Sequence, residues 1–132
     1  MLGEQIGEIR GKRIVRRVLS SDPLSVEVSF EFSGKMLGAE VNGFGTYTSQ
    51  IRPDGMVYGE GDGAFLSHDG DPVAYKASGL GRIREGGALS YRGIAYYKTT
   101  SQKLARLNTV PGVFEWEAEA NGDIHGKIWE WR

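Results

Sequence analysis

The chain has 132 residues, no cysteine and a net charge of −1 at pH 7, with acidic and basic side chains interspersed. This length is typical of one domain that buries its own core, so we expect a single domain spanning residues 1–132. The lack of cysteine excludes disulfides, thiolate metal sites and a thiol nucleophile, and the balanced charge argues against binding to nucleic acid.

The N-terminal segment carries acid early and has no apolar core, so we expect no signal peptide. No apolar run approaches the roughly 20 residues that a membrane helix needs. Together with the missing cysteines, these features favour a cytoplasmic protein without a membrane partner.

Glycine is the unusual component, because 20 of the 132 residues are glycine, about twice the usual frequency. The glycines lie at turns and inside segments that alternate in polarity. A glycine inside a strand indicates a bulge, a bend or the close approach of another group.

The alternating segments predict strands throughout. Residues 6–19 predict a long first strand with a basic outer face, and residues 24–32 alternate strictly between apolar and polar side chains. Residues 41–97 predict four consecutive antiparallel strands. Two further strands are expected over residues 112–118 and 124–132.

Four connections have one form, a type I turn followed by a glycine in the left-handed conformation. They are Arg52–Met56, Ser67–Asp71, Ile83–Gly87 and Glu119–Asp123. Counting outward from these turns predicts the register of the strands. The predicted pairs on one face are Tyr47 with Gly61, Gly63 with Tyr75, Gly79 with Tyr91, Val73 with Tyr97, and Trp116 with Gly126.

The register thus places large aromatic rings opposite glycines on one face. The other face pairs Asp62 with Lys76 and Glu115 with Lys127, which suits a solvated surface. The two faces agree on which side of the sheet is the interior.

Residues 100–108 break the strand pattern. Ser101 is a suitable N-cap, and Leu104 and Leu107 share a face. We expect a short helical turn over residues 101–107 that crosses one end of the fold. About eight strands without a substantial helix predict an all-β fold, an antiparallel up-and-down barrel. A β-sandwich is the alternative, and glycine-rich strands favour the barrel because they tolerate strong coiling.

Several stretches carry a family resemblance. They are residues 52–55 (RPDG), 58–63 (YGEGDG), 102–108 (QKLARLN) and 129–131 (WEW). Together they resemble a group of uncharacterised small bacterial and archaeal barrel proteins, similar to the calycin-type barrels that resemble plant allene oxide cyclase. The resemblance implies a barrel fold and, as one functional class, an isomerase or cyclase for a hydrophobic substrate. We match none of the cyclase's catalytic positions to residues of this sequence, so the resemblance assigns no catalytic residue.

The predicted interior suggests a binding site. The register turns inward the side chains of Tyr47, Tyr75, Tyr91, Tyr97 and Trp116. A buried phenol needs a hydrogen-bond partner, so these rings either fill the barrel and bond to the backbone, or line a pocket for an apolar or amphipathic small molecule. The binding module is our first functional hypothesis.

Glu130 is the candidate catalytic residue of the enzyme hypothesis. The register turns it inward beside Ile128 and Phe114, where a raised pKa would suit an acid or base. The alternative is a residue at the rim, paired with Arg132 or another arginine. Glu60, Asp62, His68 and His125 do not form a metal or phosphate motif, so no metal or cofactor is expected.

A third hypothesis is a structural, homo-oligomeric protein without a ligand. Several apolar residues fall on the outer face, namely Tyr58, Leu80, Ile94, Tyr96, Val113, Trp129 and Trp131. A contiguous aromatic band is typical of an interface. If the register of the flanking strands were inverted, the same residues would form the core instead.

Overall fold

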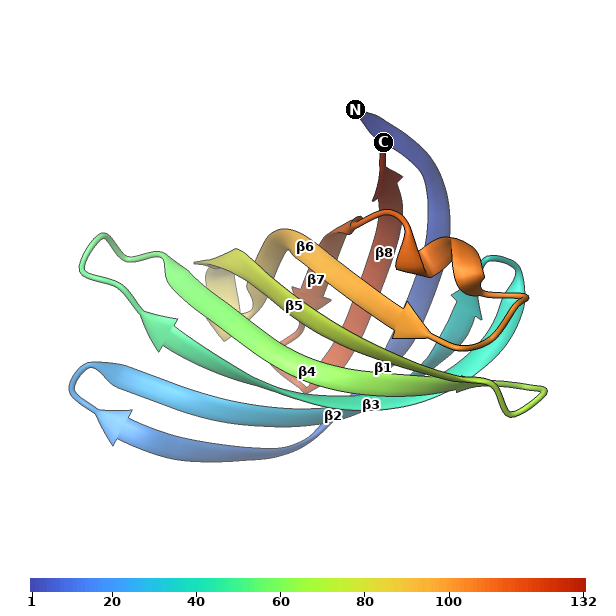
Figure 1. Ribbon diagram of the computed structural model, residues 1–132. Coiled ribbons are helices and arrows are strands. Elements are labelled where there is room, and N and C mark those ends of the chain that lie inside the picture. Colours follow the sequence, from blue (N-terminus) through green and yellow to red (C-terminus); the bar gives the residue numbers. More distant parts are fainter.

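The computed structural model describes residues 1–132, and its eight antiparallel strands close into a barrel in sequence order (Figure 1). The strands are β1 (Leu2–Ser21), β2 (Leu24–Met36), β3 (Ala39–Ile51), β4 (Val57–Ser67), β5 (Pro72–Ile83), β6 (Leu89–Thr99), β7 (Gly112–Ala118) and β8 (Asp123–Trp131). Two 3-10 helices, η1 (Glu85–Gly87) and η2 (Ala105–Asn108), interrupt them. The predicted all-β up-and-down barrel is therefore confirmed and the sandwich is excluded.

The predicted register is confirmed in three of the hairpins. Tyr47 pairs with Gly61, Gly63 with Tyr75, and Trp116 with Gly126. The turns explain this agreement. In the β3–β4 turn, the Arg52 N–H donates to the Met56 carbonyl at 2.8 Å, the Gly55 N–H donates to the Arg52 carbonyl at 2.9 Å, and Gly55 has φ 86°.

The predicted β5–β6 register is wrong by two residues. Gly79 pairs with Gly93 instead of Tyr91, and Tyr97 pairs with Tyr75 instead of Val73. The turn runs from Arg84 to Ala88, where the Gly87 N–H donates to the Arg84 carbonyl at 3.2 Å.

The cause is a pair of adjacent glycines at this turn. Gly86 and Gly87 both have positive φ, and the sequence-based count assigned the hairpin position to the first of them. A shift of two residues keeps every side chain on its face, because side chains alternate with period two. Tyr91 and Tyr97 therefore still point inward.

Glycines on the inner face leave room for aromatic rings. A Cβ atom on Gly63 would lie 2.3 Å from the Tyr75 ring, and one on Gly43 would lie 2.3 Å from the Phe32 ring. Contacts this short are not tolerated, so these rings occupy the volume that a larger residue would take.

One end of the barrel is closed by the segment around η2. Leu104 and Leu107 are 2% and 1% exposed and join the core with Phe65 and Val73. The Leu104 N–H donates to the Ser101 Oγ at 3.3 Å, so Ser101 caps the turn that precedes η2. The N-cap of η2 itself is Leu104, without a side-chain hydrogen bond, so the predicted N-cap position is wrong. The predicted helical turn is thus confirmed, as a 3-10 helix.

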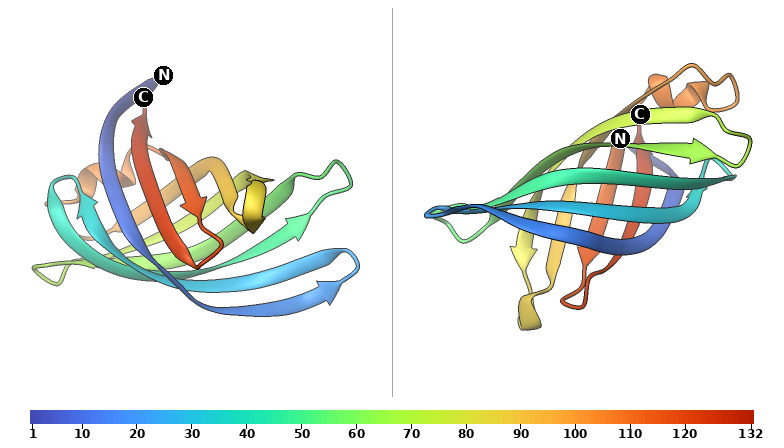
Figure 2. Two further views of the ribbon diagram at one scale, coloured as in Figure 1. Left: turned by 180° about the vertical axis from the view of Figure 1, so that it is seen from behind. Right: turned by 90° about the horizontal axis from the view of Figure 1, so that it is seen from below.

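The η2 segment does not cover the other end of the barrel, which is called the open end below (Figure 1). There the β1–β2 and β3–β4 hairpins extend past the rest of the wall (Figures 1 and 2). The pairing of β1 with β8 stops at Lys12 opposite Asp123, so the rest of β1 pairs only with β2. This explains why Val28 and Phe30 in the predicted apolar face of β2 are buried while Leu24, at the far end, is exposed. None of the helices has the length and hydrophobicity required to cross a lipid bilayer.

Candidate functional site

The barrel interior contains a cavity of about 110 Å³. All five predicted ligand-binding residues border it, namely Tyr47, Tyr75, Tyr91, Tyr97 and Trp116. The rings therefore leave a space between them and do not fill the barrel completely.

The cavity exists because the residues of one wall have no side chain larger than a methyl group. Gly61 in β4, Ala77 and Gly79 in β5, and Ala95 in β6 border it side by side on neighbouring strands. The rings of Phe30 and Phe32 from the apolar face of β2 also border the cavity, and they pack over Gly45 and Gly43 of the neighbouring strand β3.

Aromatic contacts fix the shape of the lining. The Phe30 and Trp116 ring centroids are 5.0 Å apart in an edge-to-face arrangement, and those of Tyr47 and Tyr91 are 6.0 Å apart. Tyr75 and Tyr97 have centroids 6.2 Å apart. Rings that contact one another in this way hold the shape of the lining.

The hydroxyl groups of the lining differ in whether they have a protein partner. The Tyr91 and Ser49 hydroxyls are hydrogen-bonded to each other. Burial raises the pKa of Tyr75 and of Tyr97, with no hydrogen bond that would stabilise either phenolate, so both phenols stay neutral.

The Trp116 indole N–H is also buried, without an acceptor at full hydrogen-bond geometry. Burial raises the pKa of the neighbouring Tyr47 phenol, and a weak hydrogen bond from the Trp116 indole opposes this rise in part. The lining is thus apolar apart from a few donors and acceptors that a bound molecule can satisfy.

The expected raised pKa of Glu130 is wrong. Glu130 is 2% exposed, but Arg106 binds both of its oxygens, from Nη2 at 2.7 Å and from Nε at 3.0 Å, and the Arg132 Nε lies 2.9 Å away. The hydrogen bonds from Arg106 lower the pKa of this carboxyl against the opposing effect of desolvation. Glu130 is therefore an ionised anchor between β8 and the η2 segment, as in the predicted ion-pair alternative, and it does not border the cavity.

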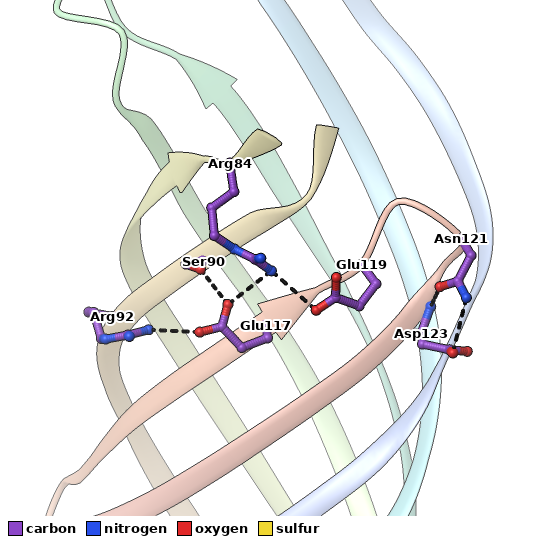
Figure 3. A network of polar contacts seen from close by, with 7 residues as sticks. All are labelled: Arg84, Ser90, Arg92, Glu117, Glu119, Asn121 and Asp123. Atoms are coloured by element: carbon purple, nitrogen blue, oxygen red, sulfur yellow. Dashed lines mark hydrogen bonds and ion pairs between the residues drawn. The ribbon is translucent and has the colours of Figure 1, made fainter. Parts of the chain in front are cut away.

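A second polar cluster lies outside the barrel, between the β5–β6 turn and β7 (Figure 3). Glu117 accepts hydrogen bonds from Ser90 and from Arg92 Nη1 at 3.4 Å, and it forms an ion pair with Arg84 Nη2 at 3.3 Å. Arg84 also donates to Glu119 at 3.2 Å. Each charge in this cluster has a partner, so the cluster joins β6 to β7 and offers no free group for chemistry.

The sequence-based prediction missed two arginines near the open end. It assigned the basic residues of the first strand to the outer face, and Lys12 and Arg17 do pair there with outward Glu31 and Glu27. Arg13 and Arg16, however, pair with Phe30 and Val28, whose side chains point inward. A register shift between Arg13 and Val15 causes this, and no residue in the segment marks it in advance.

The predicted outer band is exposed, so the inverted register is excluded. Tyr58, Leu80, Ile94, Tyr96 and Trp131 all have well-exposed side chains, while Val113 and Trp129 are half-buried. Ile94, Val113 and Trp129 lie directly opposite one another on three adjacent strands. The band is thus continuous across β6, β7 and β8.

Comparison with known proteins identifies relatives of the fold but does not identify an activity. No protein-family model matches the chain, and no curated protein matches it in sequence. A crystal structure of a protein of unknown function from Clostridium acetobutylicum has a TM-score of 0.82 at 15% identity, over 98% of this chain and 97% of that chain.

Two further solved structures share the architecture. A β-barrel-like protein from Acinetobacter baumannii matches with a TM-score of 0.77 at 12% identity, over 99% of this chain and 96% of that chain. An enzyme from Penicillium herquei matches with a TM-score of 0.69 at 12% identity, over 96% of this chain and 92% of that chain. These identities support a common small barrel fold and no more.

Proposed function

We propose that the protein binds a small, mainly apolar molecule inside its barrel. The observation that carries this proposal is the preformed cavity, whose aromatic lining includes an indole N–H without an acceptor at full hydrogen-bond geometry. Leaving such a donor unpaired in a buried site is unfavourable, and a bound molecule with an acceptor atom would relieve that cost.

The volume limits the ligand. A cavity of about 110 Å³ is somewhat smaller than the engineered apolar cavity of about 150 Å³ that holds benzene in another protein. Pockets for drug-sized ligands are several times larger, roughly 300–1,000 Å³. The ligand is therefore of the size of one small ring or branched chain, or it extends out through the open end.

Titration with phenol, followed by nuclear magnetic resonance of the indole N–H groups, tests the proposal. The chain has three tryptophans, and a Trp116→Phe variant assigns the signal of Trp116. Binding should shift the Trp116 signal selectively, because Trp116 borders the cavity while Trp131 is exposed on the outer face.

A matched pair of variants provides the control. Ala77→Leu adds a side chain that fills the cavity, whereas Ala74→Leu adds the same atoms to the exposed face of β5. Binding should be lost in the first variant and retained in the second. Equal shifts of all three indole signals, or unchanged binding in Ala77→Leu, would contradict the proposal.

The alternative function, an isomerase or cyclase resembling allene oxide cyclase, has less support. It needs an acid or base in the cavity, and Glu130 is held ionised outside it by two arginines. Glu60 and Asp62 lie at the cavity wall, but their side chains are exposed and bind Tyr58 and Lys76. No observation on this chain favours catalysis over binding.

A further inference from the structure

We infer that the ligand carries a carboxylate, which Arg13 and Arg16 bind at the open end of the barrel while its apolar part occupies the cavity. This inference rests on the proposed function and names its ligand class, a small hydrophobic monocarboxylate. It depends on the face of β1 on which the two arginines lie and on the absence of an acidic partner for either of them.

Both arginines lie on the face that continues into the cavity. Arg13 is directly opposite Phe30, whose ring borders the cavity. Arg16 is directly opposite Val28, which is itself opposite Tyr47, another lining residue. The two cations are therefore one and two strands away from the aromatic lining.

A β-bulge produces this arrangement. In a regular strand, residues 13 and 16 would point to opposite faces, since side chains alternate. The register shift between Arg13 and Val15 adds one residue to β1, so Arg13 and Arg16 face the same side. Bulges often re-aim side chains at functional sites.

Neither arginine has an acidic partner, which distinguishes them from their neighbours. On the outer face of the same strand, Arg17 binds Glu27 at 3.2 Å and Lys12 binds Asp123 at 3.4 Å. No carboxylate lies within ion-pair distance of Arg13 or Arg16.

Arg13 packs against the β7–β8 turn, whereas Arg16 is exposed. Arg13 is half-buried, its backbone N–H donates to the Gly122 carbonyl at 2.8 Å, and its guanidinium lies 3.6 Å from where a Cβ on Gly122 would be. Its charge also acts on the Tyr47 phenol, whose pKa it lowers in part. A half-buried guanidinium without an acidic partner, on the face that continues into the cavity, suits a carboxylate, which it can bind through two parallel hydrogen bonds.

Binding of benzoate compared with benzamide, measured by isothermal titration calorimetry, tests the inference. The two probes have nearly the same shape and differ in charge. Wild-type protein should bind benzoate at least about tenfold more tightly, as expected for a charge-assisted hydrogen bond. Arg13→Gln and Arg16→Gln should each remove most of this difference by weakening benzoate alone.

Arg17→Gln is the matched control, because it removes the same charge from the opposite face of the same strand. It should leave the affinity for benzoate within about twofold of wild type. Arg13→Lys, which keeps the charge, should retain part of the preference and guards against a folding defect in Arg13→Gln.

The outcomes separate the two proposals. If both probes bind equally well and the arginine variants change nothing, the cavity binds ligands but the carboxylate assignment is wrong. An equal loss of benzoate binding in Arg17→Gln would also overturn the assignment, because it would indicate a general effect of charge. If neither probe binds, the proposed function fails together with this inference.

Discussion

At the scale of single residues, the barrel is organised by pairs of an aromatic ring and a glycine. Tyr75 lies over Gly63, and Tyr91 lies over Gly59 and Gly81. Each glycine fixes the position of a ring, and the rings define the cavity. The same pairs therefore determine both stability and the shape of the cavity.

Gly63→Ala should destabilise the protein by about 1–3 kcal/mol, because the new methyl group would overlap the Tyr75 ring. Chemical denaturation gives the free energy of unfolding. The loss should shrink when Tyr75→Val is added, whereas Ala74→Val on the exposed face should change little. Additive effects of Gly63→Ala and Tyr75→Val would show that the pair does not act as a unit.

Glu130 is a second single residue that we expect to contribute strongly to the stability of the fold. Because its folded-state pKa is lowered, its contribution to stability is fully present above the unfolded-state value of about 4.5 and is lost as the pH falls toward and through the folded-state value. Glu130→Gln should therefore lower the melting temperature clearly at pH 7 and much less at pH 3.

Thermal unfolding followed by circular dichroism at both pH values measures this effect. Glu115→Gln is the control, because Glu115 belongs to an exposed ion pair with Arg92 that contributes little. A difference between wild type and Glu130→Gln that stays constant from pH 7 to pH 3 would argue against an ionised anchor.

At the scale of elements, sequence patterns determine most of the fold and part of the site. A turn with a single glycine, such as Arg52–Met56, defines one strand register. Three of the four hairpin registers predicted from such turns are confirmed. The β5–β6 turn contains Gly86 and Gly87, and both take positive φ, so the sequence does not say which one occupies the hairpin position. Only the packing of the finished barrel decides it.

The parts that could not be predicted depend on contacts between distant segments. The partner of Glu130 is Arg106, which is 24 residues away and reaches Glu130 only because η2 folds over the end of the barrel. The bulge after Arg13 likewise arises in the pairing with β2 and has no local signature. Aromatic residues of the cavity were predictable because their faces follow from period two alone.

Leu107→Ala should destabilise the protein by about 2–5 kcal/mol, because Leu107 is almost fully buried where the η2 segment closes the barrel. Leu66→Ala removes the same atoms from an exposed site and should cost under about 0.5 kcal/mol. Denaturant titration of both variants checks the comparison. Similar losses of unfolding free energy in the two variants would mean that the η2 segment is not packed tightly against the barrel core.

At the scale of the whole molecule, the outer band remains the best candidate for contact between copies. Ile94, Tyr96 and Trp131 are exposed, and Ile94 forms an apolar cross-strand row with Val113 and Trp129. We propose that two copies associate through this band, because a continuous apolar row is larger than the scattered apolar residues of an ordinary surface.

Light scattering after size-exclusion chromatography tests the association. Ile94→Lys and Tyr96→Lys together should convert a dimer into a monomer, while Phe44→Lys, which changes an exposed ring elsewhere on the barrel, should not. A wild-type protein that is monomeric at high concentration would refute the proposal. Ligand binding is expected to survive in all variants, since the cavity lies inside each barrel.

The seam between β1 and β8 has a consequence for the covalent order of the chain. The Arg132 N–H donates to the Met1 carbonyl at 2.8 Å, and the Met1 amino group contacts the Arg132 carbonyl, so the two ends of the chain meet. The strands thus form a closed ring of hairpins, and β8 and β1 are the one pair of neighbours that no peptide segment connects. A circular permutant that begins at Asp54, ends at Pro53 and joins Arg132 to Met1 by a short flexible linker should rebuild the same barrel. An unchanged circular dichroism spectrum and the same response of the Trp116 indole to phenol would show that strand order in space, and not order along the chain, specifies the cavity.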